Sequence, residues 1–278
     1  MKTSILTLAS VLSAAAVPPT YQHQGDDCEH PPAPSLCDKY TTALLKDNTA
    51  ANQQTVLTLI VNTAIIGNYS SNPGSLVAVP GILAPGTGDY KGVDLSVYFT
   101  GALKSTNRGG KTGVSVNLLD GGGAAPLKKN KPADDTTSNQ HRLVSHLYPF
   151  FASLLGCSLF GNTTDPYPGP TSMYEIHKFM ALDEKQVGWF INNVGLSAAS
   201  FGVTQEDVAT VGKALESTFG MRCSPPAKGP QSKAPELQAI CIEPTCPLST
   251  QPVCSQYDPV IEPVAKGGKG GKGGKNGH

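Results

Sequence analysis

A histidine lies within an apolar pattern in the stretch "SMYEIHKFM", residues 172–180. If this stretch is helical, one face carries the residues at the i, i+3, i+4 and i+7 positions. These residues are Met173, Ile176, His177 and Met180. A neutral imidazole on such a face can bind a metal ion through one ring nitrogen. It can equally be a core histidine hydrogen-bonded to the backbone, and the spacing alone leaves both interpretations open.

Motifs for hydrolysis or nucleotide binding are weak or missing. The six histidines include no H-E-x-x-H spacing, and the chain has no G-x-S-x-G motif. The stretch "STNRGGKT", residues 105–112, nearly matches a P-loop, but "GVSVNLL" and three glycines follow it. A P-loop needs a helix there to hold the phosphate. The sequence therefore leaves open whether the protein is an enzyme.

The N-terminus has the pattern of a secretory signal peptide. Residues 1–20, "MKTSILTLASVLSAAAVPPT", contain a lysine, an apolar run and an A-x-A cleavage site near Ala16. Asn68 and Asn162 begin N-glycosylation sequons, which belong to a eukaryotic secretory pathway. We therefore expect an extracellular glycoprotein with disulfide bonds.

The seven cysteines enter an oxidising compartment if the protein is secreted. Because seven is odd, one thiol is left over or pairs between chains. Cys157 is the one we expect to be unpaired, because it alone lies in an apolar periodic segment. The spacing of "CIEPTC" is open to a zinc site, but in an exported chain we expect disulfides. The others are Cys28, Cys37, Cys223, Cys241, Cys246 and Cys254.

Charge and hydropathy exclude two classes of partner. The formal net charge is +0 and aromatic residues make up 6%, so we expect no nucleic-acid partner. No run of eighteen apolar residues follows the signal peptide, and the chain ends in "KGGKGGKGGKNGH". We therefore expect no transmembrane segment and no lipid anchor.

The first half of the mature chain changes character at residue 67. Residues 21–36 look like an extended leader, and residues 38–66 have the composition of a buried helix, although their β-branched residues leave a strand possible. Residues 67–138 are rich in glycine and proline, so we expect a long irregular insertion with at most one hairpin.

Helical periodicity is clear in the second half. A helix is predicted from Ser138 to Gly156, and Ser172 with Glu175 predicts a capping box for the helix that carries His177. Asp183 and Thr204 are predicted to begin the last two helices. Residues 223–264 follow as a disulfide-tied extension, and residues 265–278 as a disordered Lys/Gly tail.

At His177 these elements resemble a known family. The runs "HLYPFFASLLGC" and "YPGPTSMYEIHKFMALDEKQVGWFINNVGLSAASFGVTQEDVATVGKAL" are similar to the C-terminal half of truncated globins, over residues 138–220. That family has a helix with an aromatic pair, a Y-x-G turn, a short histidine-bearing helix, a longer helix and a capped final helix. The matching residues are Tyr167, Gly169, Met173, His177, Gly202 and Val203.

The resemblance implies an all-α, globin-like helical domain over residues 37–222 that contains the insertion at 67–138. It also implies haem b as cofactor, with His177 as the proximal ligand of the iron. His146 would be a sixth ligand, a distal hydrogen-bond donor or a propionate partner. The remaining residues expected around the cofactor are Met173, Ile176, Met180, Leu143, Leu147 and Phe190.

Two functions follow from this resemblance. The first is a secreted haem protein, fungal by resemblance, whose iron binds a small diatomic ligand or does redox chemistry, as electron transfer or by reaction with peroxide. The second is a haem-free scaffold that keeps the globin-like helices and uses its loops and tail at a cell wall or host surface. In that case His177 is a core histidine. Fold resemblance does not separate the two.

Overall fold

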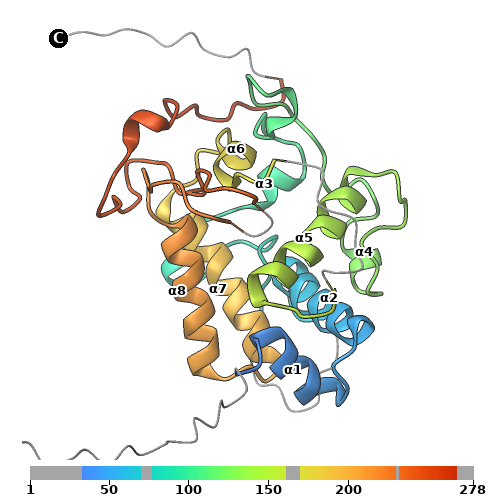
Figure 1. The fold of residues 1–278 in the computed structure, drawn as a ribbon. Helices are drawn as coiled ribbons and strands as arrows, with labels where there is room; N and C mark the ends of the chain where they lie inside the picture. The colour runs from blue at the N-terminus through green and yellow to red at the C-terminus, as the bar shows by residue number, and fades with distance from the viewer. Residues whose placement is uncertain (1–32, 70–76, 161–169, 230–231, 268–278) are drawn as a thin grey trace, which may run out of the picture. The chain divides into compact units, whose positions relative to one another are not determined.

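A computed structural model of the chain describes residues 33–69, 77–160, 170–229 and 232–267. Apart from a few isolated bridges, the regular structure in these residues is helical, which confirms the all-α prediction. The compact unit that contains the helices begins at Pro34. Its helices are α1 (Leu36–Leu45), α2 (Ala50–Ile66), α3 (Ser96–Phe99), α4 (Ala124–Leu127), α5 (Asn139–Leu155), α6 (Met173–His177), α7 (Glu184–Ser200) and α8 (Gln205–Phe219) (Figure 1).

The longer helices begin at side-chain caps that the sequence marks. In each case the cap oxygen accepts a hydrogen bond from the backbone N–H three residues later, which satisfies a donor that has no partner inside the helix. At α7 the cap is a full capping box, because Gln186 also accepts from the backbone N–H of Asp183. The capping residues are Ser35, Thr49, Ser138, Asp183 and Thr204.

The segment predicted as one buried helix, residues 38–66, forms two helices. Lys46 ends α1 in a left-handed backbone conformation, φ 70°, and Thr49 caps α2 three residues later. The helical prediction was therefore correct against the strand alternative, but the break was missed. Helix α2 is buried almost all round because it packs against α1, α5 and α7.

The described residues of this stretch, 67–69 and 77–138, are irregular, as predicted, apart from single-turn helices. Within the described part of this segment, one isolated antiparallel bridge joins Thr106 to Val114. Gly81 lets this segment approach the end of α2, since a Cβ there would lie 2.3 Å from the backbone nitrogen of Gly67. The next residue, Ile82, donates its N–H to the carbonyl of Ala64 and joins the core.

Helices α7 and α8 run side by side, and the chain after α8 returns over the end of this pair and over α6 (Figure 1). We call residues 223–264 the C-terminal segment. Its backbone is tied to α8 where Ile240 and Cys241 donate to the carbonyl of Phe219. The segment carries the Cys223–Cys254 and Cys241–Cys246 disulfides, as the sequence predicted for a disulfide-tied extension.

The prediction that Cys157 is unpaired was wrong. Cys157 forms a disulfide with Cys37, 120 residues earlier in the chain. Cys157 does pack against apolar residues of the core. However, α1 packs beside the end of α5 and brings Cys37 next to it. Cys28 lies outside the described residues.

Several predictions concern residues that the structure does not describe. They are the signal peptide 1–20, the leader 21–36 up to residue 32, the tail from residue 268, and Asn162, Tyr167 and Gly169. Asn68, the other sequon asparagine, is exposed. Every helix in the described ranges is too short or too polar to cross a bilayer.

Candidate functional site

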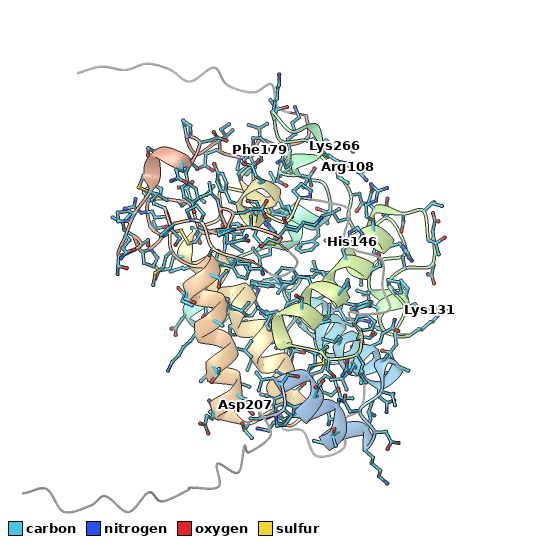
Figure 2. The ribbon with its side chains drawn as sticks, in the orientation of Figure 1. Arg108, Lys131, His146, Phe179, Asp207 and Lys266 are labelled. Carbon is cyan, nitrogen blue, oxygen red and sulfur yellow. A yellow bond between two sulfur atoms is a disulfide. The ribbon has the colours of Figure 1, made fainter. Side chains whose placement is uncertain are left out.

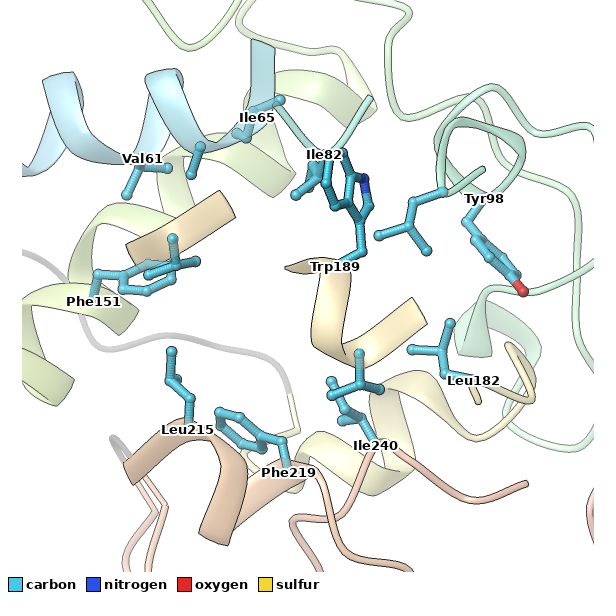
Figure 3. Packing of buried hydrophobic residues seen from close by; sticks show 14 of the residues in the cluster. Val61, Ile65, Ile82, Tyr98, Phe151, Leu182, Trp189, Leu215, Phe219 and Ile240 are labelled. Atoms are coloured by element: carbon cyan, nitrogen blue, oxygen red, sulfur yellow. The ribbon is translucent and has the colours of Figure 1, made fainter. Parts of the chain in front are cut away.

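The core contains a partly open apolar cavity of about 250 Å³. An engineered apolar cavity of about 150 Å³ already binds benzene, so this space is large enough for an organic ligand. Helices α2, α5, α6 and α7 form most of its wall, and Phe219, Ile240 and residues of the 67–138 segment complete it. Figure 3 shows Val61, Ile65 and Phe151 facing Phe219 and Ile240 around a common space.

All eight residues that the sequence predicted for the site line this cavity. They come from three helices and one following turn, so the fold brings together residues that the sequence separates. Leu143, His146 and Leu147 come from α5, Met173, Ile176 and His177 from α6, Met180 from the turn after α6, and Phe190 from α7.

The His177 imidazole is oriented by its own helix. Its Nδ1 lies 2.7 Å from the carbonyl oxygen of Met173, one turn earlier. A carbonyl can only accept, so Nδ1 carries the proton and donates, and Nε2 keeps its lone pair. Within the described residues, no second hydrogen-bond partner of this ring is present. Burial lowers the pKa of His177, which keeps the ring neutral at pH 7. This is the state in which imidazole binds metal ions.

The cap of α6 is present, but the predicted capping box is only half formed. The side chain of Ser172 accepts from the backbone N–H of Glu175 at 3.2 Å. The carboxylate of Glu175 does not return to Ser172 and instead pairs with Lys178 at 2.9 Å. Helix α6 is also shorter than the periodicity predicted, because it ends at His177 and Met180 follows in a turn.

His146 is the second histidine on the cavity wall. Burial lowers its pKa first, and the nearby positive charges of Arg142 and His141 lower it further. The ring is therefore neutral at pH 7 like that of His177. Two neutral imidazoles from different helices thus line one apolar space.

The other two polar residues of the wall, Gln186 and Thr171, are engaged with protein partners. Gln186 accepts from the N–H of Asp183 and donates to the Tyr98 hydroxyl. The hydroxyl of Thr171 donates to the carboxylate of Glu236. The interior of the cavity is therefore dominated by hydrocarbon and by the two histidines.

Sequence reasoning missed the walls that come from the first half of the chain and from the C-terminal segment. The all-round apolar character of α2 was a signal, but it does not say which side meets a ligand. The 77–99 region and Ile240 gave no signal, since only tertiary packing brings them to α6. These missed residues include Val61, Ala64, Ile65, Ile82, Leu95, Phe99 and Ile240.

The metal-ligating side chains described around this cavity are too few to bind a metal ion by themselves. In the ranges that the structure describes, no three His, Cys, Asp or Glu side chains lie together as a protein-only site requires. One available imidazole nitrogen beside an apolar space is instead what a metal inside an organic macrocycle needs.

No protein-family model, curated protein or solved structure matches the chain.

Proposed function

We propose that the protein binds haem b in this cavity, with Nε2 of His177 as the axial ligand of the iron, in a globin-like arrangement of helices. The single observation that supports this most strongly is the hydrogen bond from His177 Nδ1–H to the Met173 carbonyl. It fixes the tautomer and leaves a ligating nitrogen on the wall of an apolar cavity.

The chain offers suitable contacts for the rest of the macrocycle. Met173, Ile176 and Met180 surround the histidine, and Phe190 adds an aromatic wall from α7. Among the described residues, the lining contains no Lys or Arg. The two carboxylates of haem would therefore lie outside the apolar lining, since buried carboxylates without partners are costly.

Haem would supply an iron with a coordination position for a small ligand. The partner of the axial histidine decides which chemistry is favoured, because a carboxylate on the far nitrogen increases the negative charge of the ring and favours peroxide cleavage. His177 donates to a carbonyl instead, and Glu175 is engaged with Lys178. We therefore propose reversible binding of a neutral diatomic molecule in preference to peroxidase activity.

The proposed setting is extracellular. The three disulfides of the described residues would persist in an oxidising compartment, and the signal-like N-terminus agrees with export. The carbonyl-bound His177 is also compatible with a haem-free interaction scaffold, and the following experiment separates the two functions.

The test is a titration of the purified full chain with haemin, followed by absorption near the Soret band. A saturable, one-to-one change with a shifted Soret band is expected. Because haemin adheres to protein surfaces, Leu147→Trp serves as the control, since the indole fills the cavity. Absence of saturation, or identical titrations of both proteins, would reject haem binding and favour the scaffold function.

A further inference from the structure

The helix that carries His177 is too short to be stable by itself. Helix α6 has five residues, Met173–His177. Isolated helices shorter than about 12–15 residues are marginal in water because the first turn costs more entropy than its hydrogen bonds return. The position of His177 must therefore come from contacts outside α6.

The C-terminal segment supplies the contacts at the start of this helix. The backbone N–H of Met173 donates to Oε1 of Gln238 at 3.2 Å, and the N–H of Tyr174 donates to the carbonyl of Leu237 at 3.3 Å. The hydroxyl of Ser172 donates to the same Leu237 carbonyl. Two of the first N–H groups, which have no acceptor within α6, are thus satisfied by residues 237 and 238.

One peptide group joins this segment to the imidazole. The carbonyl of Met173 accepts from Nδ1–H of His177, and the N–H of the same peptide, on Tyr174, donates to Leu237. Hydrogen bonds in such a chain polarise one another, so the contact with Leu237 strengthens the acceptor that orients His177. This series of hydrogen bonds links the C-terminal segment to the proposed iron ligand.

The outer side of α6 is held by the same segment. The ring of Tyr257 lies edge-on to that of Tyr174, with centroids 4.7 Å apart, and the N–H of Asp258 donates to the Tyr174 hydroxyl at 2.8 Å. The carboxylate of Asp258 also pairs with Lys178 at 2.9 Å. Cys254 lies three residues before Tyr257, and its disulfide with Cys223 ties this stretch to the residues that follow α8.

Gln238 is the side chain through which this arrangement can be tested. It is 1% exposed, and its amide nitrogen lies 3.4 Å from the Thr171 carbonyl and 3.5 Å from that of Ala227. Its side chain thus contacts Thr171 just before α6, the first N–H of α6 and the C-terminal segment itself.

We propose that the C-terminal segment is part of the His177 site, and that Gln238 is a positioning residue that holds α6 so that the imidazole keeps its orientation toward the cavity. The inference rests on the proposed function in assigning His177 as the haem ligand. The segment is therefore more than an appendage to a helical domain.

The experiment compares Gln238→Met with Gln53→Met in the full chain. Both glutamines are buried. The side chain of Gln53 forms hydrogen bonds with Asp38, Leu159 and Phe160, away from α6. Both variants should lower stability. Amide hydrogen exchange over residues 172–180, measured without haem, should become about fivefold faster in Gln238→Met alone, the factor expected for loss of one net hydrogen bond.

Haem-loaded protein gives the second readout. Gln238→Met should lose haem to an excess of a haem-scavenging protein at least about fivefold faster than Gln53→Met. Unchanged exchange of residues 172–180 in Gln238→Met, or equal acceleration in both variants, would overturn the inference. If the wild-type chain takes up no haem, the proposed function fails, while the exchange measurement still decides whether Gln238 positions α6.

Discussion

His146 and His177 line the same cavity from two different helices, α5 and α6. Figure 2 shows His146 on α5, away from the C-terminal segment that holds α6. Both rings are neutral at pH 7 because burial lowers each pKa. The ring of His177 is aligned by the carbonyl of Met173 on its own helix.

The first prediction separates the roles of the two histidines. His146→Leu should retain one-to-one haem uptake, because the axial ligand remains, although the visible bands should change if the imidazole contacts the bound group. The measurement is a haemin titration of His146→Leu and His177→Leu. Loss of uptake in His146→Leu, together with normal uptake in His177→Leu, would reverse the assignment.

The second prediction concerns the cavity itself. Leu147→Trp places an indole into space that is empty of protein atoms, so the free energy of unfolding should fall by less than about 1.5 kcal/mol. Haem affinity should decrease at least about tenfold, which corresponds to about 1.4 kcal/mol. Leu44→Trp, at an exposed position of α1, is the matched control and should bind as the wild type does. Unchanged affinity in Leu147→Trp would place the haem elsewhere.

The third prediction concerns the Cys37–Cys157 disulfide. The bond joins residues 120 apart in sequence, so its removal frees a long loop in the unfolded chain. Loop-closure entropy predicts a loss of about 5 kcal/mol in the Cys37→Ala/Cys157→Ala double variant. Urea unfolding measures this loss. Peptide mapping of the wild-type protein checks the pairing independently, and a Cys28–Cys157 or Cys28–Cys37 bond would contradict it.

The fourth prediction uses the contact between α1 and α8. The Tyr40 hydroxyl donates to the carboxylate of Asp207 and accepts from the N–H of Thr204 at 2.9 Å. Tyr40 is buried, so Tyr40→Phe should cost about 1–2 kcal/mol at pH 7.

This cost should depend on pH in a defined direction. Hydrogen bonds from Lys39 and Tyr40 lower the pKa of Asp207 below 3.8. The carboxylate therefore stabilises the folded state above the unfolded pKa, and this contribution disappears as the pH falls through the lower folded value. The difference between wild type and Tyr40→Phe should shrink below pH 3.8, and Asp207→Asn should remove this change. A difference that is constant from pH 7 to pH 3 would contradict the assignment.

The helices after residue 138 could be predicted because local signals agree there. Side-chain caps at Ser138, Asp183 and Thr204 coincide with the start of apolar periodicity, and both depend on neighbouring residues only. The same periodicity placed His177 and its neighbours on one face. The eight predicted lining residues come from this part of the chain, which explains why they were found.

The other features of the fold and of the cavity wall depend on tertiary packing. The break at Lys46 is followed by the cap residue Thr49, but lysine itself rarely adopts the left-handed conformation that ends α1, so the break was missed. The pairing of Cys157 with Cys37, and the arrival of Ile82 and Ile240 at the cavity, require segments that are remote in sequence to meet. Composition and periodicity carry no information about such contacts.

The most direct test of the account replaces His177 by glycine and returns the imidazole from solution. Wild-type protein with haemin should show a shifted Soret band, His177→Gly should lose or change it, and added imidazole should restore the wild-type spectrum by entering the vacated position. His146→Gly with imidazole is the control for binding from the other wall. If His177→Gly gives the wild-type spectrum without imidazole, His177 does not ligate the iron and the central claim is wrong.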